Sequence, residues 1–245
     1  IFISDRSALK DSLLDNSFMS FVHQNDSYKR GFLQKKYSYA FDGFSFKGQT
    51  DSSNQGYDDL MDTFVFSDLC AEHKFPAEFD SYFENEWYDT LSRIEKWEEV
   101  LLAEMNLNIN TSAIGHMVSC NYYPATKHFQ TTSRGNTRLS AHPDVSLFTV
   151  FPFGVESGFT YKNPRGEWVE LGKLENWTVF PGYFLECLTN GDLKALEHKV
   201  VLPIDRDLER TSYAFFSLPR PNTEWAINGM KVTPENYFEK YLNLF

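Results

Sequence analysis

The sequence predicts a mainly β protein with flanking α-helices, and two features of the chain predict this class. From residue 112 onward, short runs of β-branched and aromatic residues alternate with turn-forming residues. Many short strands at such close spacing are typical of a β-sandwich or a barrel. The helical patterns precede these runs instead of separating them, which disfavours a doubly wound parallel sheet. We therefore expect a β core that carries helices from the N-terminal part of the chain.

Three regions of the chain are expected to form one integrated domain. Residues 1–110 are predicted to be mainly helical and to pack on the core, and residues 111–232 to form the β core. Residues 233–245 are predicted to form a closing helix, because Thr233 and Pro234 supply an N-cap and a proline at the first helical position.

Two segments of the N-terminal region carry clear patterns. Residues 83–106 place apolar side chains at near-helical spacing with Glu and Lys between them, which predicts an amphipathic helix. The run Trp97-Glu98-Glu99 is expected to lie on the solvated face of that helix. Residues 44–57 are rich in Gly, Ser and Asp and are expected to form a long loop.

The second region contains segments of strand composition, separated by turn signals such as Asn163-Pro164-Arg165-Gly166. Cys187 is expected to be a core residue of one of these strands. The predicted strands cover residues 115–123, 145–153, 158–163, 167–171, 176–180, 183–188, 197–203 and 210–218.

Charge and cysteine content exclude several classes of protein. The net charge is −11, which argues against a nucleic-acid or anionic-membrane partner, because both require a basic surface. The apolar runs are too short to span a bilayer. The three cysteines, Cys70, Cys120 and Cys187, are far apart and form no CxxC pair. A disulfide scaffold is therefore not expected, and we expect a cytoplasmic location. Protein partners are not indicated.

His142 and Asp144 form the first candidate metal-ligand pair. Residues two apart on a strand or at its end point the same way, so an imidazole and a carboxylate can meet one ion. The H-x-D pair alone is common by chance. His198, 54 residues after Asp144 in a β-rich run, supplies a second imidazole. Two histidines and one carboxylate leave metal positions open, which suits an Fe(II) that binds a cosubstrate and O2 together.

Arg210 and Ser212 share one face of a later predicted strand. A guanidinium fork and a hydroxyl make a good receptor for a carboxylate. A dicarboxylate could chelate iron with its oxo-acid end and anchor its far end on Arg210, and these are the needs of 2-oxoglutarate. The plainer reading is an exposed arginine in a surface salt bridge.

The chain resembles the isopenicillin N synthase-like group of the 2-oxoglutarate/Fe(II)-dependent oxygenases. The resemblance rests on H-x-D, the later histidine and R-x-S, and it runs from about Asn121 to Pro219. Further matching segments are Asn121-Tyr122-Tyr123-Pro124, Leu147-Phe148-Thr149-Val150, Gly166-Glu167-Trp168-Val169 and Thr189-Asn190-Gly191.

This resemblance implies a double-stranded β-helix (jelly-roll) core that is the catalytic part of the chain. It also implies that Tyr123 and Asn121 help to hold 2-oxoglutarate. Two positions depart from the group's pattern: Pro143 stands where threonine is usual, and Lys199 where arginine is usual. Neither departure removes a metal ligand.

Lys127, Arg134 and Arg138 are the candidate substrate-binding residues. They cluster with His128 before His142 within an acidic protein. A solvated loop is the ordinary explanation, and a field that attracts an anionic substrate to the iron is the alternative.

The function expected from these residues is an Fe(II)- and 2-oxoglutarate-dependent dioxygenase. It would hydroxylate, desaturate or oxidatively cyclise a small, carboxylate-bearing metabolite of specialised metabolism. Two alternatives stay open: an oxidase of the same fold that does not use 2-oxoglutarate, and a non-catalytic jelly-roll binding protein.

Overall fold

Strands from both halves of the chain build one large antiparallel sheet in the computed structural model, which describes residues 1–9, 12–34, 41–48, 59–69, 75–127, 137–227 and 229–243. Its two central strands, β4 and β11, pair in register from Arg210↔Tyr123 to Pro219↔Ile114. In order across the sheet, the strands are β1 (Phe2–Ser7), β9 (Asn176–Pro181), β6 (Phe148–Phe151), β11 (Arg210–Pro219), β4 (Ile114–Tyr123), β3 (Asp62–Ser67) and β2 (Gly43–Ser45).

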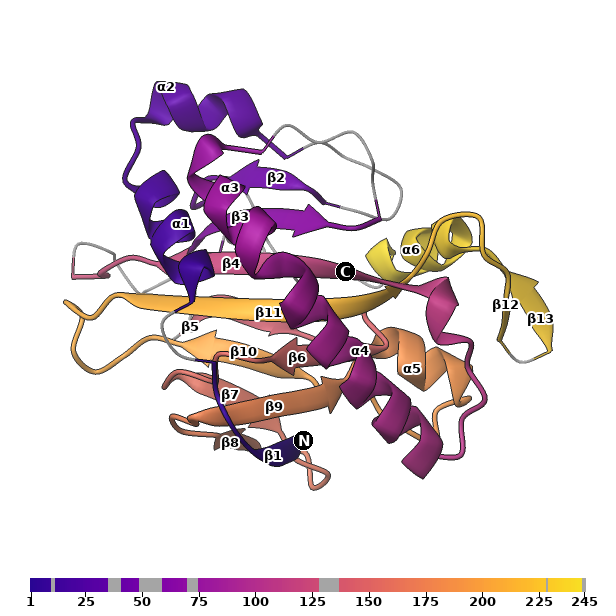
Figure 1. Ribbon diagram of the computed structural model, residues 1–245. Coiled ribbons are helices and arrows are strands. Elements are labelled where there is room, and N and C mark those ends of the chain that lie inside the picture. Colours follow the sequence, from indigo (N-terminus) through magenta and orange to yellow (C-terminus); the bar gives the residue numbers. More distant parts are fainter. Residues whose placement is uncertain are drawn as a thin grey trace.

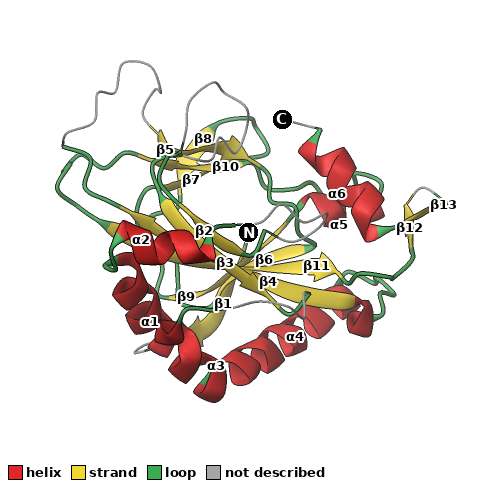
Figure 2. Ribbon diagram, turned by 90° about the horizontal axis from the view of Figure 1, so that it is seen from above, coloured by secondary structure: helices red, strands yellow, loops and turns green. Residues whose placement is uncertain are grey.

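A smaller sheet lies on one side of this large sheet (Figure 2). Its strands, in order, are β5 (Thr137–His142), β10 (His198–Val201), β7 (Phe159–Lys162) and β8 (Trp168–Glu170). The predicted turn between β7 and β8 is confirmed, because Gly166 has φ +80° and its N–H donates to the carbonyl of Asn163. A separate hairpin joins β12 (Trp225–Ile227) to β13 (Met230–Val232).

Helices cover the opposite side of the large sheet (Figures 1 and 2). The helices there are α1 (Leu13–Val22), α3 (Asp80–Asn85) and α4 (Trp87–Glu104), with α2 (Asp26–Lys29) beside them. Short 3-10 turns cover Arg30–Phe32, Ala77–Phe79 and Thr111–Ala113, and α6 (Pro234–Leu242) closes the described chain. The fold is therefore mainly β with flanking helices and a jelly-roll core, as predicted.

The predicted helix over residues 83–106 is confirmed, but it is divided into α3 and α4 at Glu86. The Glu86 carboxylate accepts hydrogen bonds from the Ser12 hydroxyl at 2.6 Å and from the Leu13 N–H at the start of α1. Stacked and edge-on rings, among them Phe64 and Phe79 at 5.0 Å, fill the space between helices and sheet.

The prediction of a strand over residues 183–188 was wrong. These residues form α5 (Tyr183–Leu188), so Cys187 lies on a half-buried helix and not in a core strand. A short, mostly apolar run of six residues fits both periodicities. The following turn, with φ +53° at Asn190 and +85° at Gly191, ends the helix.

The closing helix is confirmed as α6, whose N-cap is Thr233 and whose first residue is Pro234. Of the predicted loop over residues 44–57, Phe44 and Ser45 belong to β2, and residues 49–58 lie outside the described chain. The division into regions 1–110, 111–232 and 233–245 stays a prediction. None of the described helices has the length and apolar character needed to cross a membrane.

Candidate metal centre and cosubstrate site

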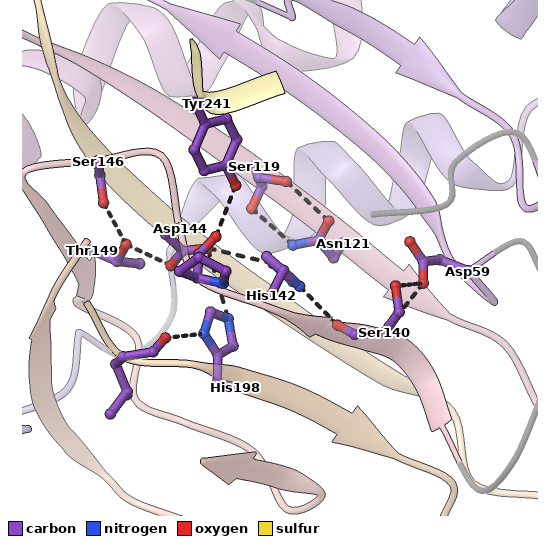
Figure 3. Close-up of polar contacts among 12 residues, drawn as sticks. Asp59, Ser119, Asn121, Ser140, His142, Asp144, Ser146, Thr149, His198 and Tyr241 are labelled. Carbon is purple, nitrogen blue, oxygen red and sulfur yellow. Dashed lines mark hydrogen bonds and ion pairs between the residues drawn. The ribbon is translucent and has the colours of Figure 1, made fainter. Parts of the chain in front are cut away.

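His142, Asp144 and His198 come together at one end of the smaller sheet (Figure 3). His142 ends β5 and pairs directly with His198, the first residue of β10. Asp144 follows two residues after the strand, and its Oδ1 lies 3.5 Å from His142 Nε2 and 3.7 Å from His198 Nε2. One ligand atom from each residue lies within 4.8 Å of the other two.

The backbone fixes which nitrogen each imidazole turns inward. His142 Nδ1 lies 2.7 Å from the carbonyl of Ser140, and His198 Nδ1 lies 3.1 Å from the carbonyl of Leu196. With Nδ1–H donating to a carbonyl, each Nε2 keeps its lone pair free and faces Asp144. Such partners set the tautomer and the ring orientation of metal-binding histidines.

Asp144 is oriented in the same way by a hydroxyl pair. Thr149 on β6 donates to its Oδ2 at 2.6 Å, and the Thr149 hydroxyl lies 2.8 Å from that of Ser146. The second oxygen, Oδ1, is left to face the two imidazoles. Asp144, Thr149 and Ser146 are all buried.

Burial and mutual contacts shift the pKa values of all three groups. Burial raises the pKa of Asp144, but His198 and His142 outweigh it and hold this pKa below its ordinary value. Burial lowers the pKa of His198, so its imidazole is favoured in the neutral form. Burial also opposes protonation of His142, but the hydrogen bond and charge of Asp144 raise its pKa.

The donor set fits Fe(II). Bonds from imidazole nitrogen or carboxylate oxygen to such a metal are about 2.1 Å long, so two ligand atoms of one ion lie no more than about 4.2 Å apart. Both distances to Asp144 Oδ1 satisfy this limit. Two nitrogens and one carboxylate oxygen on one side leave the opposite coordination positions to other ligands.

The four residues expected to hold 2-oxoglutarate form two neighbouring cross-strand pairs on β4 and β11, Arg210↔Tyr123 and Ser212↔Asn121. The Arg210 guanidinium lies 4.9 Å from the centre of the Tyr123 ring. Its Nε and Nη1 are buried and have no hydrogen-bond partner among the described residues. Buried donors are normally paired, so these two nitrogens fit a receptor for a carboxylate.

A cavity of about 840 Å³ joins the two groups of residues. It is lined by the metal-site residues, by the four residues on β4 and β11, and by many apolar side chains. Asn121 Oδ1 accepts hydrogen bonds from the hydroxyls of Thr63 and Ser119, at 3.0 and 2.9 Å. The apolar lining includes Leu33, Phe41, Phe44, Met61, Val65 and Met117.

Neither Lys127 nor Arg138 lines the described part of this cavity. Lys127 forms an exposed ion pair with Asp207 at 2.9 Å. Arg138 is 3% exposed and donates to backbone carbonyls. Arg134 lies outside the described residues, as does His128. Their role in substrate binding stays a prediction.

Several residues of the site were not predicted from the sequence as site residues. Asp59 accepts from the Ser140 N–H and hydroxyl, both at 2.9 Å, next to the carbonyl that binds His142. Tyr241 of α6 donates to the Pro143 carbonyl at 2.8 Å and lines the cavity (Figure 3). Both lie far from H-x-D in sequence, and no local motif marks them. Thr149 lies in one of the segments that resemble the oxygenase group, but the sequence gives it no role of its own.

Known proteins resemble this chain over the same strands. Residues 114–219 match the 2OG-Fe(II) oxygenase superfamily. The chain is 33% identical over 87 residues to Gibberellin 2-beta-dioxygenase 7 and 31% identical over 109 residues to Jasmonate-induced oxygenase 4, both of Arabidopsis thaliana. These stretches cover 35% and 44% of this chain but only 25% and 29% of those relatives.

The fold also resembles that of a full-length protein from Neurospora crassa, solved in complex with alpha-KG. The TM-score is 0.74 at 18% identity, and the likeness covers 96% of this chain and 83% of that one. Fold and site together define a jelly-roll protein with two histidines and one carboxylate at a metal centre. The matched region, from β4 to β11, is similar to the 2OG-Fe(II) oxygenase superfamily, and this confirms the resemblance seen in the sequence.

Proposed function

We propose that this protein is an Fe(II)- and 2-oxoglutarate-dependent dioxygenase that oxidises a C–H bond of a small molecule. The observation that carries the proposal is a pair of buried nitrogens on Arg210 that lack a partner in the described part of the chain. Arg210 lines the same cavity as the His142, Asp144 and His198 cluster. An oxidase that does not use 2-oxoglutarate would use this receptor only for a carboxylate of its own substrate, so succinate release separates the two functions.

In this proposal, His142 Nε2, Asp144 Oδ1 and His198 Nε2 hold the iron. Bound iron with 2-oxoglutarate and O2 supplies oxidation of a C–H bond, coupled to conversion of 2-oxoglutarate into succinate and CO2. Arg210 and Ser212 bind the far carboxylate of the cosubstrate, and Tyr123 and Asn121 flank it. The protein places the substrate and excludes water with the apolar residues of the cavity.

The substrate is proposed to have a mainly apolar body. The Gln34 carboxamide and the Ser45 hydroxyl line the cavity, but they are bonded to each other at 2.8 Å, and Gln34 also donates to the Phe41 carbonyl. The described wall beyond the metal therefore offers mostly apolar and aromatic surface. A carboxylate on the substrate, and a place in specialised metabolism, remain our hypotheses. A cytoplasmic location is proposed on the separated cysteines alone.

The proposal is tested by anaerobic addition of Fe(II) and 2-oxoglutarate, followed by a search for the charge-transfer absorption of their chelate. Succinate release on admission of O2, with a panel of small apolar and carboxylated substrates, then tests turnover. His198→Ala should abolish the absorption. Substrate oxidation without succinate would favour the oxidase, and failure to bind Fe(II) would favour the binding protein.

A further inference from the structure

Arg138 is a second buried arginine close to the cosubstrate site. It lies on β5, four residues before His142, and is 3% exposed. Within the described chain, no ion pair joins it or Arg210 to a carboxylate, and the Nε of Arg138 is buried without a partner. A buried guanidinium without a counter-ion is costly, so its presence calls for an explanation.

The contacts of Arg138 hold the ends of the two strands that carry the cosubstrate residues. Its Nη2 donates to the carbonyl of Pro124, at 3.1 Å, and to that of Leu208. Pro124 directly follows Tyr123, and Leu208 lies two residues before Arg210. Because Tyr123 and Arg210 are cross-strand partners, one guanidinium group fixes both sides of this pair.

The two guanidinium groups also act on each other. Burial, and then the positive charge of Arg210, lower the pKa of Arg138. Two neighbouring buried cations favour an anion between or beside them, since the attraction of each charge is little screened in the interior. Arg138 does not line the cavity, so it acts on a ligand through Arg210 and through its own field.

We propose that Arg138 is a positioning residue and second buried cation for the far carboxylate of 2-oxoglutarate. This rests on the proposed function, and it assigns to Arg138 selectivity for a dicarboxylic over a monocarboxylic oxo-acid. The chelating end of the cosubstrate is bound by the metal, so loss of Arg138 weakens only the contribution of the far carboxylate.

The test compares two oxo-acids on the Fe(II)-loaded protein without O2. 2-Oxoglutarate and 2-oxobutyrate chelate the metal through the same atoms, but only the first has a far carboxylate. Their dissociation constants are read from the charge-transfer absorption for wild type, Arg138→Gln, Arg138→Met and Arg138→Lys. Arg165→Gln, which removes an exposed arginine from the β7–β8 turn, is the control.

Both neutral variants should raise the dissociation constant of 2-oxoglutarate by roughly tenfold or more, because one poorly screened charge is lost. They should change the dissociation constant of 2-oxobutyrate by no more than about twofold. Arg138→Lys should restore much of the preference for 2-oxoglutarate over 2-oxobutyrate. Equal weakening of both oxo-acids would show a merely structural role and overturn the inference, as would no change in either. If wild type binds neither oxo-acid, the proposed function itself fails.

Discussion

At the scale of single residues, the metal centre is built from ligands whose unused polar atoms are already bound. His142 and His198 each turn Nδ1 toward the carbonyl two residues earlier in the chain, and Asp144 accepts from Thr149. Each ligand therefore reaches the metal position without having to reorganise. The hydroxyl of Thr149 is the one of these partners that a substitution can remove without changing the backbone.

Thr149→Val is expected to lower the affinity for Fe(II) by about tenfold to a hundredfold, because partners of this kind orient metal ligands. Valine keeps the shape of threonine, so the fold should be preserved. The measurement is an anaerobic Fe(II) titration, with circular dichroism to check the fold. Thr178→Val is the matched control, since Thr178 is also fully buried in the large sheet and its hydroxyl donates, among the described residues, only to the Asn176 carbonyl. Equal losses in both variants would contradict a specific role for Thr149.

The sequence identifies ligands better than it identifies their supports. His142 and Asp144 are recognisable because a two-residue spacing has a local meaning on a strand, and Arg210 and Ser212 share that spacing. The partners Asp59 and Tyr241 are separated from them by tens of residues, so only the fold brings them close. The pairing of Arg210 with Tyr123 likewise depends on strand register, which no single segment encodes.

At the scale of elements, α6 holds the segment that carries Asp144 in place through two hydrogen bonds. Tyr241 donates to the carbonyl of Pro143 at 2.8 Å, and Tyr237 donates to that of Val145 at 2.5 Å. These two carbonyls flank Asp144 on both sides. The helix begins at a well-capped position, Thr233-Pro234, and its burial of Tyr237 keeps both hydroxyls in place.

The double variant Tyr237→Phe with Tyr241→Phe is expected to lower Fe(II) affinity severalfold, because the Asp144 segment loses both restraints. Each lost hydrogen bond should also cost about 1 kcal/mol of stability. Iron titration and urea unfolding measure the two effects separately. Tyr88→Phe, on the exposed face of α4, is the control. Unchanged iron affinity in a destabilised double variant would limit α6 to a structural role.

Helix α4 contains a buried acidic residue, Glu98, whose burial the sequence does not reveal. Glu98 was expected on a solvated face, but this was wrong, because it is 1% exposed and bonds to His116 Nε2 at 3.1 Å and to the Ser217 hydroxyl. The two partners lie on the central strands β4 and β11, so the helix is attached to the middle of the sheet. The neighbouring Glu99 is exposed, as predicted.

Stability should depend on pH through this pair. Burial opposes protonation of His116, but Glu98 raises its pKa above the ordinary value of 6.5. The stabilisation from this pair is therefore complete below the pKa that His116 has in the unfolded chain. It is lost as the pH rises through the higher pKa that His116 has in the folded protein. Urea unfolding of the metal-free protein between about pH 6 and about pH 9 should show this decline, and Glu98→Gln should reduce it. Glu99→Gln should retain it. A decline of equal size in both variants would place its cause elsewhere.

The mistaken strand over residues 183–188 shows the limit of pattern reading at this scale. Six mostly apolar residues between turn signals satisfy both a strand and a short helix. Tertiary contacts settle the matter, since the N–H of Tyr183 donates to the Asp144 carbonyl at 2.7 Å and starts the turn there. Longer segments such as β4 and β11 were predicted well, because their composition and length leave no such ambiguity.

At the scale of the whole molecule, the cavity lies between two sheets that contribute different chemistry. The smaller sheet supplies His142 and His198, and the large sheet supplies Arg210 and Ser212. A sequence can predict two such sets of residues, but their separation across a cavity depends on how the sheets pack. Helices α1, α3 and α4 cover the other side of the large sheet and leave this side to the ligands (Figure 2).

This arrangement predicts an order of stabilisation by ligands. Fe(II) joins residues of the smaller sheet, whereas 2-oxoglutarate on that iron reaches Arg210 and links the two sheets. A ligand at a hundred times its dissociation constant adds about 2.7 kcal/mol. For a chain of this size, that corresponds to roughly 5–10 °C in the thermal midpoint. Thermal unfolding under anaerobic conditions should show one increment for Fe(II) and a further one for 2-oxoglutarate.

The second increment should require the first, because the oxo-acid end of 2-oxoglutarate has no anchor without the metal. Arg210→Gln should keep the increment from Fe(II) and lose most of that from 2-oxoglutarate, since the far carboxylate then has no guanidinium to bind. Equal stabilisation of metal-free protein by 2-oxoglutarate would contradict the shared site. It would mean that the carboxylate receptor and the metal centre bind their ligands independently, although they line one cavity.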